Sequence, residues 1–265
     1  MKDSQHNYAD VNGLKLYYEV HGTGEPLILL HGGVGGMVMF GPNLAALAKT
    51  RRVIAVDLQA HGRTADIDRP LHFELLADDI AALIAHLRLK KTGVMGFSLG
   101  GGVALQLAIR PPKIVRKLVL VSTPFRRDGF YPEVLRNFDQ MGPETGSFMK
   151  HSPLYRLYPG VDWPKLFAKL GDLQRQDYDW SSQVSKIKAP VLIVFADADA
   201  IRPAHIIEFF RLLGGGKGDA GLDGSARPSN ELAILPGLTH YSIVSSPALS
   251  QAVATFLDAS SAGTN

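Results

Sequence analysis

A single serine stands between two glycines in the stretch Gly96-Phe97-Ser98-Leu99-Gly100. An apolar run ends at this stretch and an Ala/Leu-rich run follows it, which predicts a strand, a sharp turn and a helix. Flanking glycines relieve the crowding of such a turn, so the serine hydroxyl is lifted above the sheet as a nucleophile. The N–H of Leu99, at the start of the helix, then faces a developing oxyanion. A tight turn without chemistry is the alternative interpretation.

A serine hydroxyl is a weak nucleophile at neutral pH, so it needs a base, and the base needs an orienting acid. In sites built on this kind of turn, the acid and then the histidine follow the serine along the chain. His240, in "LPGLTHYSIV", lies just past the last predicted strand and is the predicted base. His31 and His61 also follow strands and are the alternatives on the same face. Asp197 and Asp199, in "VLIVFADADAIRP", are the candidate acids.

A glycine-rich loop, "LLHGGVGG" at residues 29–36, follows an early predicted strand. Glycines allow the backbone to come close to a substrate and to donate N–H groups to it. We therefore predict that this loop supplies the second half of an oxyanion hole. A flexible turn is the alternative.

These residues need strands that end at a common edge, and the apolar pattern supplies them. Residues 14–20 alternate in the way that a strand does. Continuous apolar runs bounded by Gly, Pro or Asp are typical of parallel strands buried on both faces, and they lie at residues 26–32, 51–59, 91–97, 116–123, 189–197 and 230–237. Helical patterns alternate with them at residues 41–50, 73–90, 99–109, 203–213 and 246–258. The alternation predicts an α/β fold, with a mostly parallel central sheet flanked by helices.

Residues 125–188 interrupt this alternation, because they hold aromatic residues, prolines and charges but no clear buried strand. A structureless loop of that length is uncommon in a compact domain, so we predict an inserted helical cap. The chain then divides into a core domain of residues 1–124 and 189–265 and a cap of residues 125–188. A second, glycine-rich stretch at residues 214–230 is predicted to be a surface loop.

The composition of the chain excludes several classes of function. Of 265 residues, 46% are hydrophobic and 20% charged, which suits a folded protein with a sizeable core. The net charge is only +3 and its basic residues are scattered, so we expect no nucleic-acid partner. Without cysteine there are no disulfides, thiolate metal sites or thiol nucleophiles. No apolar run approaches the roughly 20 residues of a membrane helix, and the polar N-terminal stretch does not look like a signal peptide, so we expect a cytoplasmic protein.

Five motifs together resemble those of the α/β-hydrolases: "LLHGGVGG", "VIAVDLQAHGRT", "VMGFSLGG", "VLIVFADADAIRP" and "LPGLTHYSI". The resemblance runs from about residue 14 to residue 258. It implies that Ser98 is the nucleophile, Asp199 the acid and His240 the base, and that the N–H groups of Gly33 and Leu99 form the oxyanion hole.

The sequence departs from the patterns of these families in two places. Where the families carry G-x-x-D before the acid, this chain has Ala196 in the glycine position and Asp199 in the last place, which favours Asp199 over Asp197. Where they carry D-x-x-G-H-G, Ala60 replaces a glycine between Asp57 and His61.

The expected reaction is hydrolysis of a small to medium carboxylic ester through an acyl-enzyme intermediate, with no cofactor and no metal. Lactone, carbon–carbon bond and peracid chemistry on the same residues are alternatives, and so is a ligand-binding protein without activity. The substrate and the oligomeric state are left open. Aromatic residues of the cap suggest an apolar pocket, although they could also form the core of the cap itself; they include Phe125, Phe130, Tyr131, Phe138, Tyr155 and Trp163.

Overall fold

The computed structural model describes residues 5–259, which form one eight-stranded sheet in the order β1-β2-β4-β3-β5-β6-β7-β8. The strands β3 to β8 run parallel to one another, whereas β2 pairs antiparallel with both β1 and β4. Their bounds are Gln5–Val11 (β1), Leu14–His21 (β2), Glu25–Leu30 (β3), Arg51–Val56 (β4), Thr92–Phe97 (β5), Val115–Val121 (β6), Val191–Ala198 (β7) and Glu231–Thr239 (β8). The predicted fold class, a mostly parallel sheet flanked by helices, is confirmed.

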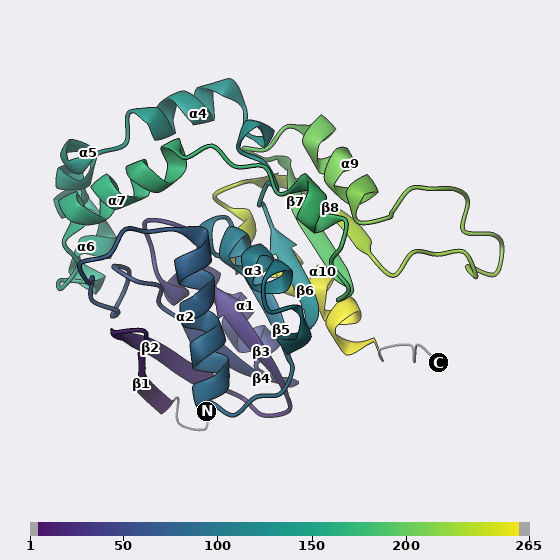
Figure 1. Ribbon diagram of the computed structural model, residues 1–265, viewed down its shortest axis with the longest axis horizontal. Coiled ribbons are helices and arrows are strands. Elements are labelled where there is room, and N and C mark those ends of the chain that lie inside the picture. The colour runs from purple at the N-terminus through teal and green to yellow at the C-terminus, as the bar shows by residue number, and fades with distance from the viewer. Residues whose placement is uncertain (1–4, 260–265) are drawn as a thin grey trace.

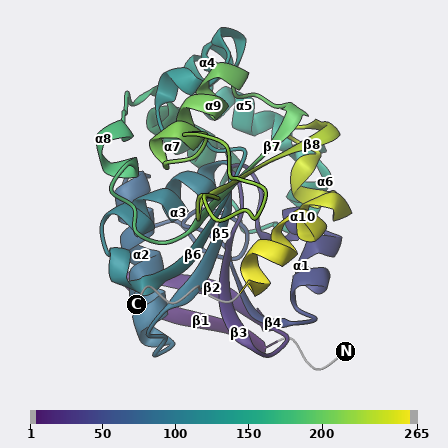
Figure 2. The ribbon, with the colours of Figure 1, turned by 90° about the vertical axis from the view of Figure 1, so that its right-hand side faces the viewer.

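Helices cover both faces of the sheet, as Figure 2 shows. On one face lie α1 (Pro42–Leu47) and α10 (Pro247–Asp258), which pack over one apolar cluster of the core. On the other face lie α2 (Phe73–His86), α3 (Leu99–Ile109) and α9 (Pro203–Leu212), which pack over the larger cluster. Nearly every residue of α3 is buried, which agrees with its lack of a polar face. None of the described helices is both long and apolar enough to cross a bilayer.

Each predicted strand and helix is found within a few residues of its expected position, but β1 was missed. Its sequence, "QHNYADV", is too polar to stand out as an apolar run. The signal that could have found it is the pair Asn12-Gly13, which joins β1 to β2 with both residues at positive φ. Asn-Gly is a strong indicator of a two-residue hairpin turn.

Between β6 and β7 the chain adds no strand to the sheet and forms mainly helices, most of them at one end of the molecule (Figure 1). We call residues 125–188 the cap segment, and its helices are α4 (Pro132–Asp139), α5 (Pro143–Ser147), α6 (Pro153–Leu157), α7 (Trp163–Arg175) and α8 (Ser181–Val184), with short 3₁₀ turns at Arg127–Gly129 and Phe148–His151. The segment is helical, as expected. Its division from the rest of the chain as a separate domain stays a prediction.

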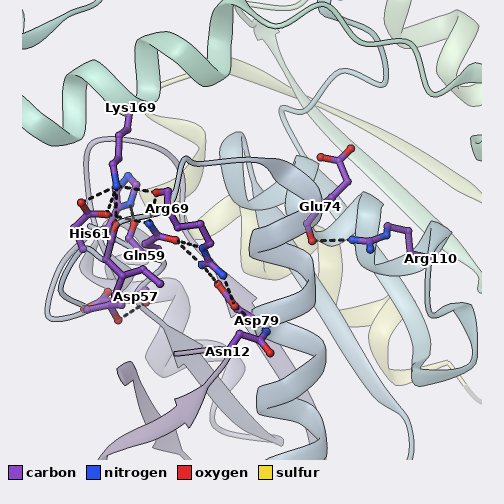
Figure 3. Close-up of polar contacts among 12 residues, drawn as sticks. Asn12, Asp57, Gln59, His61, Arg69, Glu74, Asp79, Arg110 and Lys169 are labelled. Atoms are coloured by element: carbon purple, nitrogen blue, oxygen red, sulfur yellow. Dashed lines mark hydrogen bonds and ion pairs between the residues drawn. The ribbon is translucent and has the colours of Figure 1, made fainter. Parts of the chain in front are cut away.

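The cap segment is fastened to the loop that follows β4 by buried and half-buried polar contacts (Figure 3). Lys169 of α7 donates from Nζ to both carboxylate oxygens of Asp66 at 2.7 Å and to the carbonyl oxygens of Ile67 and Arg69 at 2.8 Å. Arg69 in turn pairs with the buried carboxylate of Asp79 on α2, at 2.5 Å. These contacts therefore connect the cap segment, through the loop after β4, to α2, which packs on the sheet.

Candidate active site

Ser98 lies between the end of β5 and the start of α3, with φ 51° and ψ −113°. A non-glycine residue seldom takes such a positive φ, and here the neighbouring backbone enforces it. A Cβ on Gly96 would lie 2.1 Å from the Gly100 carbonyl oxygen, and one on Gly100 would lie 2.4 Å from the Leu30 carbonyl oxygen. Both glycines of the motif are thus required by close approach of backbone to backbone.

The side chains of Ser98, His240 and Asp199 form one continuous line of hydrogen bonds. His240 Nε2 lies 3.1 Å from Ser98 Oγ, and His240 Nδ1 lies 2.9 Å from Asp199 Oδ1. An ionised carboxylate can only accept, so Nδ1 carries the proton and Nε2 is free to accept from the serine hydroxyl. Residues 98, 199 and 240 come from the ends of β5, β7 and β8 and are brought together in the order expected.

Two further donors hold the Asp199 carboxylate. Ser122 Oγ donates to Asp199 Oδ2 at 2.5 Å, and the Ala196 N–H donates to the same oxygen at 3.0 Å. Burial acts to raise the pKa of Asp199, but the hydrogen bonds from His240, Ser122 and Ala196 outweigh it, so this pKa lies below its ordinary value. The carboxylate therefore stays charged and points one oxygen at the imidazole.

Ser122 is a site residue that the sequence reasoning missed. It directly follows β6, is fully buried, and has φ 49°. Its N–H donates to the Val194 carbonyl oxygen of β7, which fixes its position beside Asp199. A polar residue immediately after a buried apolar strand was the available signal, because parallel strands end at a common edge.

Asp197, the other candidate acid, points away from this line of hydrogen bonds. Its carboxylate is exposed and accepts from the N–H groups of Gly237 and Leu238 at 3.0 and 3.2 Å. These two hydrogen bonds fix the last residues of β8. The imidazole of His240 is hydrogen-bonded to Asp199 and not to Asp197.

His31 and His61 follow β3 and β4, but both rings are completely buried. His31 Nε2 accepts from the Leu58 N–H at 3.0 Å, so Nδ1 carries the proton and donates to the Gly32 carbonyl oxygen at 2.6 Å. Burial lowers the pKa of His31 to about 4 and that of His61 to about 3. Neither ring reaches Ser98 by a hydrogen bond, and the His31 ring ties the glycine loop to the turn after β4.

That turn contains the Ala60 departure noted above. Ala60 takes φ 65°, a conformation in which glycine is usual, while Gly62 takes φ 57°. A Cβ on Gly62 would lie 2.2 Å from Asp57 Oδ2. Asp57 accepts from the N–H groups of Met37 and Arg63 at 2.8 and 2.9 Å, so it joins the glycine loop to this turn.

The glycine loop reaches Ser98 from the other side. A Cβ on Gly32 would lie 2.7 Å from the Phe97 ring and 3.4 Å from Ser98 Cβ. Gly33 has room for a Cβ, since the nearest atom would be Leu170 Cδ2 at 3.7 Å. Among the described residues, the N–H groups of Gly33 and Leu99 have no acceptor. Val34 has φ 65°, which is strained for a β-branched residue and turns the loop beside Gly33.

A cavity of about 470 Å³ opens at Ser98 and His240. Its floor is the carboxyl edge of the sheet and its roof is the cap segment, and the mostly apolar lining includes Gly33, Phe97, Phe130, Phe138, Leu154 and Leu170. Of the aromatic residues singled out from the sequence, Phe130 and Phe138 line the cavity. Phe125 and Trp163 are buried, whereas Tyr155 is exposed. Such a cavity suits a small ligand that is largely apolar.

The comparison with known proteins agrees with this architecture. The family model for the alpha/beta hydrolase fold matches residues 25–144. The chain has the α/β-hydrolase fold. A curated relative of this α/β-hydrolase is "Putative carbamate hydrolase RutD" of Azorhizobium caulinodans, which is 28% identical over 222 residues, or 75% of this chain and 83% of the relative.

Solved structures of other α/β-hydrolases superpose over nearly the whole chain. A thermophilic esterase from Thermogutta terrifontis aligns with a TM-score of 0.75 at 22% identity, covering 96% of this chain and 98% of that one. The enol-lactonase of Burkholderia xenovorans LB400 aligns with a TM-score of 0.75 at 22% identity, covering 95% of this chain and 100% of that one. At this identity the two likenesses establish the fold.

Proposed function

We propose that this α/β-hydrolase is a serine hydrolase that cleaves small to medium carboxylic esters through an acyl-enzyme intermediate. Ser98 is the nucleophile, His240 the general base and acid, and Asp199 the carboxylate that orients the imidazole. The N–H groups of Gly33 and Leu99 form the oxyanion hole, and the cap segment shapes the pocket above them.

In the first half of the reaction, Ser98 Oγ attacks the carbonyl carbon while its proton passes to His240 Nε2. The carbonyl oxygen becomes an oxyanion, which accepts hydrogen bonds from the two N–H groups. As the tetrahedral species collapses, the ester C–O bond breaks and His240 returns the proton to the departing alkoxide. Asp199 keeps its charge throughout and stabilises the imidazolium.

In the second half, a water molecule attacks the acyl carbon and gives its proton to His240 Nε2. Collapse then breaks the bond to Ser98 Oγ, which takes the proton back, and the carboxylic acid leaves. Every proton moves between the substrate, water, Ser98 and His240, so the chemistry uses only groups on this chain and water.

The observation that carries the proposal is the uninterrupted line from Ser98 Oγ to His240 Nε2 at 3.1 Å and from His240 Nδ1 to Asp199 Oδ1 at 2.9 Å, opening on a mostly apolar cavity. A serine that is merely part of a turn needs neither an aligned imidazole nor a cavity. The names of the relatives, an esterase among them, are compatible with attack on an acyl carbon.

The test is a series of p-nitrophenyl esters of increasing acyl length, assayed from pH 5 to 9 with and without a chelator. We expect activity on the shorter and middle members at every pH at which the chain stays folded, and no change with the chelator. A fluorophosphonate probe should label Ser98. A lactone and a carbamate serve as competing substrates, and turnover of either without any ester turnover would contradict the esterase assignment.

A further inference from the structure

The roof of the cavity carries two polar side chains that the proposed reaction does not use. Asn137 on α4 and Gln174 on α7 both line the cavity, and the two helices pack against each other. Within residues 5–259, neither carboxamide group has a hydrogen-bond partner in the protein. Asn137 is exposed and Gln174 is half-buried, so both amide heads are available at the cavity to donate and accept hydrogen bonds.

The Gln174 carboxamide lies away from the reacting serine. Leu170, one helical turn before Gln174 on α7, is the residue that faces Gly33 across the cavity. Gln174 lies about 6 Å farther along the helix axis. The cavity lining is otherwise mostly apolar and includes Phe130 and Phe138, so a substrate whose carbonyl carbon sits at Ser98 would contact apolar side chains as well as the amides.

The lining contains no lysine, arginine, aspartate or glutamate among the described residues. Arg127, which donates to the backbone oxygen of Gln174 at 2.8 Å, is paired with Asp139 at 2.7 Å. An ionised group entering the cavity would lose water without gaining a counter-charge, which is costly. A neutral amide would exchange water for partners that both donate and accept.

We propose that Asn137 and Gln174 form a subsite for a neutral amide-type group at the far end of an apolar acyl chain. This inference rests on the proposed function for the position of the reacting carbonyl. It assigns the substrate class: an ester whose acyl chain is apolar in the middle and ends in an uncharged amide or carbamate, and not in a carboxylate.

Three p-nitrophenyl esters of similar length test this assignment: octanoate, 6-acetamidohexanoate and the monoester of octanedioic acid. For the wild-type chain we expect kcat/KM on the acetamido ester to match or exceed kcat/KM on octanoate. On the carboxylate-ended ester we expect kcat/KM to be lower than on octanoate by roughly tenfold or more, because the buried charge has no counter-charge. Gln174→Leu and Asn137→Leu should each lower kcat/KM on the acetamido ester by roughly three- to tenfold, the effect of one neutral hydrogen bond. The loss on octanoate should be smaller, so that the ratio of kcat/KM on the acetamido ester to that on octanoate falls.

Gln140→Leu is the matched control, because Gln140 is exposed at the end of α4 and lies outside the cavity lining. It should leave the ratio between the esters unchanged. Equal losses on octanoate and on the acetamido ester in the roof variants, or no discrimination against the carboxylate by the wild-type chain, would overturn the subsite.

A binding measurement separates this inference from the proposed reaction. Methyl 6-acetamidohexanoate and methyl octanoate are titrated into the Ser98→Ala chain by calorimetry, with and without Gln174→Leu. Tighter binding of the amide, lost in the double variant, supports the subsite even if the wild-type chain hydrolyses no ester. Equal or undetectable binding of the amide overturns the subsite, while ester turnover by the wild-type chain leaves the proposed reaction standing.

Discussion

The floor and the roof of the cavity hold their residues in different ways. On the floor, Ser98, Ser122 and Asp199 are fixed by backbone strain and by short hydrogen bonds from neighbouring strands. On the roof, Asn137 and Gln174 project from helices and have no partner within the described part of the chain. Covalent chemistry needs reacting atoms held to within fractions of an ångström, whereas recognition of a substrate's far end tolerates a looser fit. We infer that the floor carries the reaction and the roof carries selectivity.

The sharpest test of this division is Ser98→Ala, which removes only the hydroxyl that we propose as the nucleophile. We expect kcat to fall by roughly 10⁴-fold or more, since loss of the nucleophile disables the whole hydrogen-bonded unit. Circular dichroism and the unfolding midpoint should match the wild-type chain, and Ser182→Ala, on an exposed serine of α8, is the control. A variant that retains a tenth of the wild-type rate would mean that Ser98 is part of a turn and has no catalytic role.

A second test compares the two aspartates on the floor. Asp199→Asn should lower kcat by roughly 10³–10⁴-fold, because a neutral amide neither stabilises the imidazolium nor selects the reactive tautomer. Asp197→Asn should change kcat only a few-fold, since the amide oxygen can still accept from Gly237 and Leu238. Comparable losses of kcat in the two variants would contradict the assignment of Asp199, rather than Asp197, as the acid.

The difference between floor and roof also explains what the sequence could predict. Ser98, Asp199 and His240 follow apolar strands, and strands that end at one edge of a parallel sheet bring such residues together. Asn137 and Gln174 lie in a helical segment with no comparable rule, and only tertiary packing decides which face of α4 or α7 meets the cavity. The same limit explains why the aromatic residues of the cap segment could not be divided in advance between cavity lining and core.

A third prediction asks whether the roof and the floor unfold together. Burial lowers the pKa of His31, on the floor, from 6.5 to about 4. It also lowers the pKa of His205, where α9 meets the cap segment, to about 4, helped by the charge of Arg126. Between pH 6.5 and 4 the unfolded chain binds protons that the folded chain does not, so stability present above pH 6.5 is lost as pH falls toward 4. The loss is about 3 kcal/mol for each such histidine.

Urea unfolding at pH 7, 6, 5 and 4.5 measures this loss with two probes. Both tryptophans, Trp163 and Trp180, lie in the cap segment and are buried, so their fluorescence reports the roof. Far-ultraviolet circular dichroism reports the whole chain. Because Lys169 ties α7 to the loop after β4, we expect coincident transitions that shift together to lower urea as pH falls. An earlier fluorescence transition would show a roof that opens on its own.

The smallest expected effect concerns Ser122, which is bonded to Asp199 and lies outside the cavity lining. Ser122→Ala removes the 2.5 Å hydrogen bond to Asp199 Oδ2, and we expect kcat to fall roughly tenfold with KM unchanged, the cost of one hydrogen bond to a charged group. Ser122→Gly is the matched variant, because glycine adopts φ 49° without strain while it also lacks the hydroxyl. If the hydroxyl positions Asp199, both variants lose the same fraction of kcat although the glycine variant has the relaxed turn. If kcat falls in the alanine variant and recovers in the glycine variant, then kcat depends on backbone strain at residue 122 and not on the hydrogen bond to Asp199.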